Sequence, residues 1–133
     1  MIVGVADTHT ALWLLFDDKR LSKAAGDFIE NAAAQRRSIA VSAITVAEVV
    51  YLVEKGRVPA NAYQVLRDAL ADPEHVLTDA PFTAEIVESL RKILRTAVPD
   101  MPDRIIAATS LHLGVPLISC DGQIQAANLP IIW

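Results

Sequence analysis

Short apolar runs alternate along the chain with longer segments in which apolar residues recur at helical spacing. The short runs are rich in Val and Ile and predict strands, at Ile2–Ala6, Ser38–Ser42, Val76–Thr78, Pro116–Ser119 and Ile131–Trp133. The longer segments predict helices, at Thr8–Phe16, Ser22–Gln35, Ala43–Lys55, Pro59 to about Ala71, Thr83–Leu94 and Asp103–Leu113. Strands separated by one or two helices indicate an α/β fold, with a mostly parallel sheet and helices on both faces. Such a sheet explains why the strands are apolar throughout.

Composition changes this picture in a few respects. A chain of 133 residues suits a single domain, which we predict to span residues 1–133. Hydrophobic residues make up 53% and charged residues 21%, which excludes disorder as the dominant state. The single cysteine, Cys120, excludes an internal disulfide framework and a thiolate zinc site. The apolar excess suggests that a partner covers part of the surface.

The charge balance and the N-terminal residues bear on partners and location. Sixteen acidic residues against 12 basic ones give a net charge of −4, which argues against a simple basic clamp on nucleic acid. The N-terminus carries no basic leader, and no apolar run reaches the roughly 18 residues that a membrane span needs. We therefore expect a cytoplasmic protein without membrane association.

Four acidic residues fall where parallel strands end or their helices begin. Asp7 directly follows the first strand, Glu48 lies about two turns into the helix after the second strand, and Asp121 comes two residues after the fourth. Asp103 starts the helix that leads into that fourth strand. Ligands of open α/β sheets bind beyond the carboxyl ends of the strands. We therefore expect the four carboxylates to meet at one edge of the sheet.

Crowded carboxylates repel one another, and a hard divalent cation removes that conflict. Mg²⁺ or Mn²⁺ takes oxygen ligands from a few carboxylates and keeps several waters. Such an ion ionises a water at neutral pH and stabilises a leaving oxygen. Hydrolysis of a phosphodiester is the chemistry that best suits this set of ligands.

Each acid also has a purely structural explanation. Asp7 can cap the helix that follows it, Asp121 can serve a turn before Gly122, and Asp103 can favour the positive end of a helix dipole. Glu48 is the hardest to explain in this way, because its helix is apolar over most of its circumference and burying a carboxylate is costly. The alternative for Glu48 is a narrow solvated stripe shared with Ser42, Thr45 and Lys55.

At these residues the sequence resembles the PIN-domain ribonucleases, and among them the VapC-type toxins of toxin–antitoxin modules. Five pieces carry the resemblance in the family's order and span nearly the whole chain. They are Asp7-Thr8-His9 with Leu12-Trp13-Leu14-Leu15, Ser42–Glu48, Met101–Thr109, Leu117–Asp121 and Pro130–Trp133. Each piece alone is weakly specific, whereas five in order are considerably more so.

The resemblance implies a PIN-like three-layer fold, with a short sheet between helices, and an endoribonuclease that depends on Mg²⁺ or Mn²⁺ and cleaves structured cellular RNA to leave a 5′-phosphate. Asp7, Glu48 and Asp103 would be the core metal ligands, and Asp121 would hold a second ion or an outer water. Thr8, and less directly Ser119, would orient a carboxylate or the substrate. The resemblance also implies a homodimer and a cognate antitoxin. Asp100 is the alternative third acid if its helix starts earlier.

Other readings of the chain remain open. An aspartyl phosphotransferase usually has a second acid two residues after the first, where this chain has His9, and a receiver-like signalling domain would need paired acids that are absent. A PIN fold without catalysis, acting as an RNA-binding or scaffold module, is the main alternative. Basic residues beside the acids would line the RNA path, and the candidates are Arg104 and Lys19-Arg20. Trp13 and Trp133 are expected in the core, and Asp79 outside the site.

Overall fold

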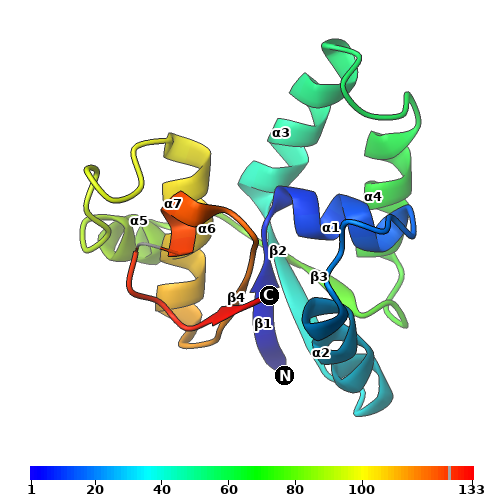
Figure 1. Ribbon diagram of the computed structural model, residues 1–133, viewed down its shortest axis with the longest axis horizontal. Helices are drawn as coiled ribbons and strands as arrows, with labels where there is room; N and C mark the ends of the chain where they lie inside the picture. The colour runs from blue at the N-terminus through cyan, green and yellow to red at the C-terminus, as the bar shows by residue number, and fades with distance from the viewer. Residues whose placement is uncertain (126) are drawn as a thin grey trace.

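The computed structural model describes residues 1–125 and 127–133, and its centre is a five-stranded parallel sheet (Figure 1). The strands lie in the order β3-β2-β1-β4-β5, so that β1 is central. Their bounds are Ile2–Ala6 for β1, Ser38–Ser42 for β2, Leu77–Ala80 for β3, Leu117–Ile118 for β4 and Ile131–Ile132 for β5. The chain moves outward from β1 on one side through β2 to β3, and later returns to the other side through β4. All carboxyl ends therefore lie at one edge, with a switch in direction between β1 and β4.

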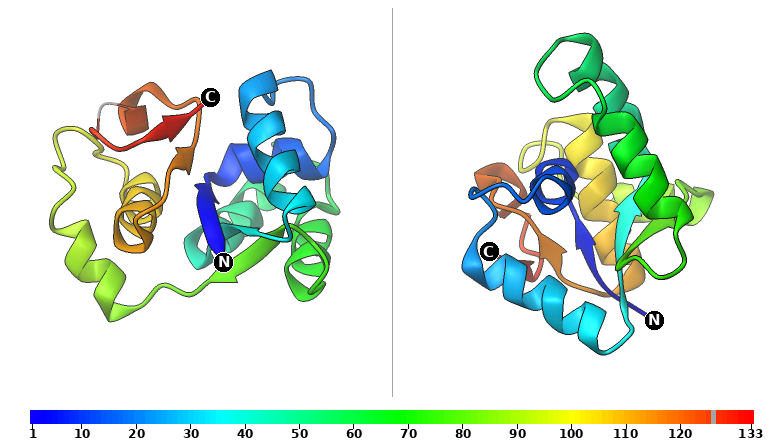
Figure 2. Two further views of the ribbon diagram at one scale, coloured as in Figure 1. Left: turned by 90° about the horizontal axis from the view of Figure 1, so that it is seen from below. Right: turned by 90° about the vertical axis from the view of Figure 1, so that its right-hand side faces the viewer.

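Helices cover both faces of the sheet. Their bounds are Thr8–Leu15 for α1, Lys23–Ala34 for α2, Ala43–Glu54 for α3, Ala62–Ala71 for α4, Ala84–Leu90 for α5, Met101–Leu113 for α6 and Gly122–Gln125 for α7. Figure 2 shows α5, α6 and α7 on one side of the strands and α1, α2 and α4 on the other. Helix α3 runs beyond the carboxyl edge and contacts both α4 and α6. The predicted α/β architecture is confirmed.

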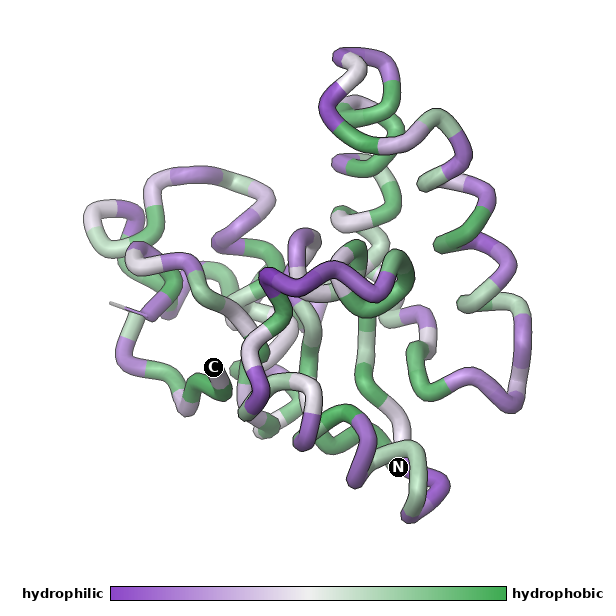
Figure 3. The backbone as a smooth tube through the Cα atoms, turned by 45° about the vertical axis from the view of Figure 1, so that its right-hand side comes forward, coloured by the Kyte–Doolittle hydropathy of each residue, from purple (hydrophilic) through white to green (hydrophobic). Residues whose placement is uncertain are grey.

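Successive residues of a strand enter opposite halves of the core. In β1, Val5 packs with α5, α6 and α7, whereas Ala6 packs with α1, α2 and α4. In β2, Ala40 faces the first group and Val41 the second. This follows from the two-residue period of a strand, and it explains why strands covered on both faces carry no polar alternation. Figure 3 shows the same arrangement as hydrophobic central strands and mostly hydrophilic outer turns.

Glycine at position 4 of β1 is required by close packing. A Cβ atom there would lie 2.9 Å from Cε1 of Phe28 and 3.4 Å from Cδ1 of Ile39. Phe28 belongs to α2 and packs against the core beside the sheet. The absence of a side chain at Gly4 therefore lets α2 approach the central strand.

Helix caps follow the sequence closely at several ends. Ser22 caps α2 and Ser42 caps α3 through their side-chain oxygens. Gly114 ends α6 at φ 67°, a left-handed conformation in which glycine has no steric penalty.

Three predicted boundaries are wrong for identifiable reasons. Helix α4 begins at Ala62 rather than Pro59, because residues 59–61 form a turn in which the N–H of Ala62 donates to Pro59 O. Helix α5 ends at Leu90 rather than Leu94, since the chain then tightens into turns whose carbonyls accept from Arg104. Strand β3 is Leu77–Ala80 rather than Val76–Thr78, because β2 pairs with it as far as Ala80.

Helix α6 starts at Met101, two residues earlier than expected. Asp100 is its N-cap, and its Oδ2 atom accepts a hydrogen bond of 3.2 Å from the N–H of Asp103. Pro102 fits the first turn, where its missing N–H has no helical partner to lose. Among the helices in the described ranges, none is both long and apolar enough to cross a membrane.

Candidate active site

Asp7 stands at the carboxyl end of the central strand and uses both carboxylate oxygens. Its Oδ1 atom accepts from the N–H of Thr10 at 2.9 Å and thereby caps α1. Its Oδ2 atom accepts from the hydroxyl of Ser119 at 2.5 Å, across the switch point between β1 and β4. Asp7 is only 6% exposed. The capping role and the predicted site position are therefore filled by the same side chain.

Glu48 on α3 reaches back to the start of α1. The hydroxyl of Thr8 donates to Glu48 Oε1 at 2.5 Å, and the hydroxyls of Thr8 and Thr45 lie 3.1 Å apart. Thr8 and Thr45 are buried, while Glu48 is half-buried. Helix α3 therefore turns Glu48 towards Asp7 and into a hydroxyl-lined position, rather than onto a free solvated stripe.

Asp121 follows β4 and is linked to Asp7 through one serine. The N–H of Asp121 donates to Ser119 Oγ at 3.0 Å, and Ser119 is completely buried. Oδ1 of Asp121 accepts from the N–H groups of Gln123 and Ile124, at 2.8 and 3.3 Å, where α7 begins. Asp121 thus serves the turn that the sequence suggested and also lies at the same edge as Asp7.

Asp103 is the acid whose ionisation the surroundings change most. Burial, followed by the negative charges of nearby carboxylates, raises the pKa of Asp103 from its ordinary 3.8 to about 7. Those carboxylates are, in order of effect, Asp100, Asp121, Glu48 and Asp7. Asp103 therefore lies close enough to Asp100 and the other three predicted acids for their negative charges to act on it across the carboxyl edge.

The pKa of Glu48 is raised by the same causes with one opposing contact. Burial raises it most, and the hydrogen bond from Thr8 partly lowers it. The negative charges of Asp100 and Asp7 raise it further, whereas the charge of His9 lowers it. His9 is exposed and lies beside this site.

The comparisons with known proteins assign the chain to a family. The family model described as PIN domain matches residues 5–128. The chain belongs to the PIN domain family. Ribonuclease VapC22 of Mycobacterium tuberculosis is 30% identical over 130 residues, which are 98% of this chain and 95% of that protein. The predicted relationship to PIN-domain ribonucleases of the VapC type is confirmed.

Solved structures show the same fold. VapBC2 from Rickettsia felis, bound to a DNA fragment from their promoter, has a TM-score of 0.71 at 19% identity, covering 98% of this chain and 97% of that chain. A toxin–antitoxin complex from Klebsiella pneumoniae has a TM-score of 0.69 at 23% identity, covering 98% of this chain and 96% of that chain. The three-layer PIN architecture expected from the sequence is thus found in solved proteins.

Arg104, expected beside the substrate, has another task in this PIN domain. Its Nη2 atom donates to the carbonyl oxygens of Leu90 and Ile93, at 3.1 and 2.8 Å. Its guanidinium therefore holds the turn after α5 against α6 and does not join the carboxylates. Lys19 and Arg20 lie beyond α1, and Arg20 is paired with Asp18 at 2.8 Å. Asp79, which was expected outside the site, is an exposed residue of β3, and β2 lies between β3 and the central strand.

Sequence reasoning missed Thr10 as a positioning residue, whereas it placed Thr45 on the same helix face as Glu48. The N–H of Thr10 donates a hydrogen bond to Asp7, and its hydroxyl donates one of 2.9 Å to the carbonyl of Ile118. Thr10 thereby links α1 to β4. Thr45 supports Thr8 beneath Glu48. A hydroxyl three residues after Asp7, and another three before Glu48, are the sequence signals that point to these contacts.

The donors at this edge fit a hard divalent cation in their chemistry. They are carboxylate oxygens supported by hydroxyl and N–H groups, and their mutual repulsion is the conflict that a cation relieves. Within residues 1–125 and 127–133, no three Asp, Glu, His or Cys side chains converge closely enough to hold an ion together. These carboxylates would therefore have to turn towards a common point to share one.

The pKa of Asp103 predicts an unusual dependence of stability on pH. Folded Asp103 keeps its proton to about pH 7, whereas the unfolded residue loses it near 3.8, so the folded state binds more protons between these values. In the presence of EDTA, we expect the free energy of unfolding to fall as pH rises through this window. Asp103→Asn should flatten the profile and stabilise the metal-free protein at about pH 8 by about 1–3 kcal/mol.

Urea denaturation of the wild type and Asp103→Asn, at several pH values between about 4 and about 8, measures this effect. Asp79→Asn is the matched control, because Asp79 is exposed and its charge is not among those that raise the pKa of Asp103. A wild-type profile that rises with pH over the whole window, unchanged by Asp103→Asn, would contradict the prediction.

Proposed function

We propose that this PIN domain is an endoribonuclease that depends on Mg²⁺ or Mn²⁺ and acts as the toxin of a type II toxin–antitoxin module. Its substrate is structured cellular RNA, whose phosphodiester bonds it hydrolyses. The observation that carries the proposal is the gathering of Asp7, Glu48, Asp103 and Asp121 at the carboxyl edge of the sheet, where burial and the charges of neighbouring acids raise the pKa of Asp103. The similarity to a ribonuclease along 98% of the chain supports it.

In this proposal the four acids have two tasks. Asp7, Glu48 and Asp103 hold the cation, and Asp121 holds a second ion or an outer water. Bound there, the cation supplies a water of lowered pKa and stabilises charge on the phosphodiester. Ser119 and Thr8 fix the carboxylates of Asp7 and Glu48 by direct hydrogen bonds, so that less reorganisation is needed when an ion and RNA bind.

The proposed partners are a cognate antitoxin and a second copy of this chain, both in the cytoplasm. Large hydrophobic side chains are exposed on α3, α5 and the segment leading into α6, which is the kind of surface that partners cover. They are Val50, Tyr51, Val87, Leu94 and Met101. The similar fold of the toxin–antitoxin complex from Klebsiella pneumoniae supports an antitoxin partner.

Expression in a bacterium and cleavage in vitro test the proposal. The wild type should arrest growth, and the purified protein should cut RNA with Mn²⁺ to leave 5′-phosphate ends, while Glu48→Gln does neither. A harmless wild type that cuts no RNA with Mn²⁺ would refute the active nuclease and favour the catalytically inactive RNA-binding or scaffold module. Sequencing the cut ends then identifies the RNA and the bond.

Thr8→Val tests the positioning of Glu48. Valine keeps the shape of threonine but removes the hydroxyl that donates to Glu48, so we expect the pKa of Glu48 to rise and its carboxylate to lose its orientation. Loss of such a supporting hydrogen bond should reduce cleavage about 10- to 100-fold and raise the Mn²⁺ concentration needed for half-maximal rate. Thr8→Ser, which restores the hydroxyl, should recover most of the rate. Equal Mn²⁺ dependence in Thr8→Val and wild type would contradict this role.

A further inference from the structure

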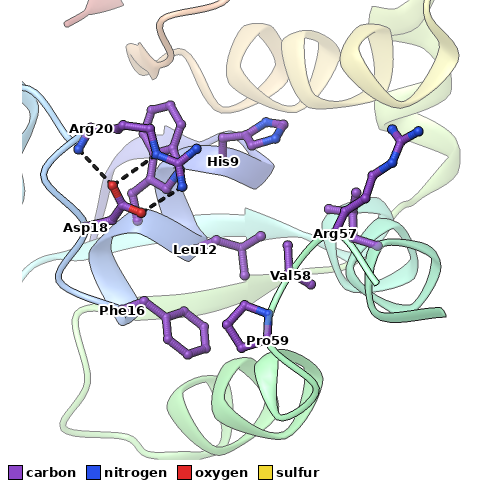
Figure 4. Close-up of a pocket in the computed structure, with 10 residues that line it drawn as sticks. His9, Leu12, Phe16, Asp18, Arg20, Arg57, Val58 and Pro59 are labelled. Carbon is purple, nitrogen blue, oxygen red and sulfur yellow. Dashed lines mark hydrogen bonds and ion pairs between the residues drawn. The ribbon is translucent and has the colours of Figure 1, made fainter. Parts of the chain in front are cut away.

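A cavity of about 370 Å³ lies beside the carboxylates, between α1, the end of α3 and the α3–α4 connection (Figure 4). Its floor is apolar and comes from Leu12, Phe16, Leu52, Val58 and Pro59. Trp13 and His9 add aromatic rings, with centroids 5.7 Å apart. Trp13, expected in the core, is half-buried and lines this cavity instead. The cavity therefore offers an apolar and aromatic surface open to solvent.

The cavity neighbours the acidic site. Leu52 and Arg57 line it and also line a second hollow that reaches Glu48 and Asp100. His9, whose charge acts on Glu48, lines the cavity from the opposite side. A molecule held at the carboxylates can therefore extend into the cavity without leaving the surface.

Three basic side chains lie around the cavity and the second hollow: Arg20 lines the cavity, Lys55 lines the second hollow, and Arg57 lines both. Arg20 is held by Asp18 through two hydrogen bonds, of 3.0 and 2.8 Å, and its guanidinium lies 5.1 Å from the Trp13 ring. Arg57 and Lys55 are exposed and, among the described residues, form no ion pair with a carboxylate. In Figure 4, Arg57 projects away from the apolar floor. Arg57 is thus available to an anion that spans the cavity and the acidic hollow.

We infer that the cavity receives an unstacked nucleobase of the RNA beside the bond to be cut, while Arg57 contacts the adjoining phosphate. The inference rests on the proposed ribonuclease function and adds how the substrate is held. Bases splayed out of loops and bulges bind to aromatic and apolar side chains, and their phosphates need cations, both of which this surface supplies. The carboxylates of the acidic site repel the phosphates of the RNA backbone. The exposed guanidinium of Arg57 next to them supplies the positive charge that these phosphates require.

The test compares binding and cleavage in matched variants. Arg57→Glu reverses an exposed charge and should raise KM about 10-fold and lower the slope of log affinity against log salt by about 1. Arg67→Glu, the same change at an exposed residue of α4 that lines neither hollow, is the control. Trp13→Ala should weaken binding about 5- to 100-fold, and Trp13→Phe should retain most of it.

A direct signal for the base comes from tryptophan fluorescence. Trp133→Phe leaves Trp13 as the single tryptophan of the chain. A short oligouridylate, with Ca²⁺ in place of Mn²⁺, should quench it, while the same ribose-phosphate chain without bases should not. Quenching by both probes alike would overturn the assignment of a base to the cavity.

The outcomes separate this inference from the proposed function. If the wild type cuts RNA, and Arg57→Glu and Trp13→Ala bind and cut it equally well, the inference is wrong and the ribonuclease stands. If those variants cut normally but escape neutralisation by the antitoxin, the cavity binds a protein segment and the inference is likewise wrong. If the wild type cuts no RNA, the ribonuclease proposal fails, and base-dependent quenching of Trp13 still supports an RNA-binding cavity.

Discussion

Asp7→Asn is expected to lower the rate of RNA cleavage by about 100- to 1000-fold while leaving the fold intact, the size of effect seen when one preorganised electrostatic group is removed. Asparagine keeps an oxygen that caps α1 through the N–H of Thr10, and Asn and Asp are equally good caps. What is lost is the negative charge at the end of the central strand, together with the second oxygen that accepts from the Ser119 hydroxyl. Initial rates on one RNA substrate, at saturating Mn²⁺, measure the effect.

Two comparisons make the Asp7→Asn result decisive. Asp79→Asn removes one negative charge from an exposed position of β3 and should cleave at the wild-type rate. The melting temperature of Asp7→Asn should stay close to that of the wild type, which excludes unfolding as the cause. Cleavage by Asp7→Asn within a fewfold of the wild type would show that the reaction does not need this carboxylate.

Much of the fold could be predicted because the local sequence pattern, in apolar runs and capping residues, favours the same elements that packing of the core requires. Strands β1 and β2 have the predicted bounds. The apolar run of each strand leads directly to a residue that caps the next helix, Asp7 after β1 and Ser42 at the end of β2, so the sequence marks where the strand stops. Boundaries fail where a contact distant in sequence decides them. Helix α5 ends early, where the carbonyls of Leu90 and Ile93 accept from Arg104, 14 residues beyond Leu90. Nothing in the sequence around Leu90 signals that contact.

The candidate site shows the same division. The positions of Asp7 and Asp121 after strands of a parallel sheet were enough to predict that they share an edge. The chain of contacts from Asp121 through Ser119 to Asp7 joins residues up to 112 positions apart, and hydroxyl side chains are too common for sequence to assign their partners. Asp100 follows the same logic, because only the earlier start of α6 brings its charge to bear on Asp103.

Removing divalent cations with EDTA is expected to reduce cleavage by at least about 1000-fold, and adding Mn²⁺ or Mg²⁺ should restore it. The physical reason is that the cation both lowers the pKa of the attacking water and stabilises charge on the phosphate, which together contribute several kcal/mol. Without it, the half-buried carboxylate of Asp103 is partly protonated near neutral pH, and the remaining acids repel an approaching phosphate. Rates in EDTA, and after titration with each ion, measure the effect.

A stability measurement shows whether the ion acts at these carboxylates. Binding to the folded state alone stabilises it by about 2.7 kcal/mol at 100 times the dissociation constant, so Mn²⁺ should raise the melting temperature of the wild type. The rise should be much smaller for Asp7→Asn and Asp103→Asn and unchanged for Asp79→Asn, because only the first two lose a carboxylate of the acidic edge. Ca²⁺, whose larger radius suits more ligands, should stabilise the protein without supporting full cleavage. Undiminished cleavage in EDTA would show that the reaction needs no divalent cation. Equal stabilisation by Mn²⁺ in all three variants would show that the ion does not bind at these carboxylates. Either result would refute the proposed chemistry.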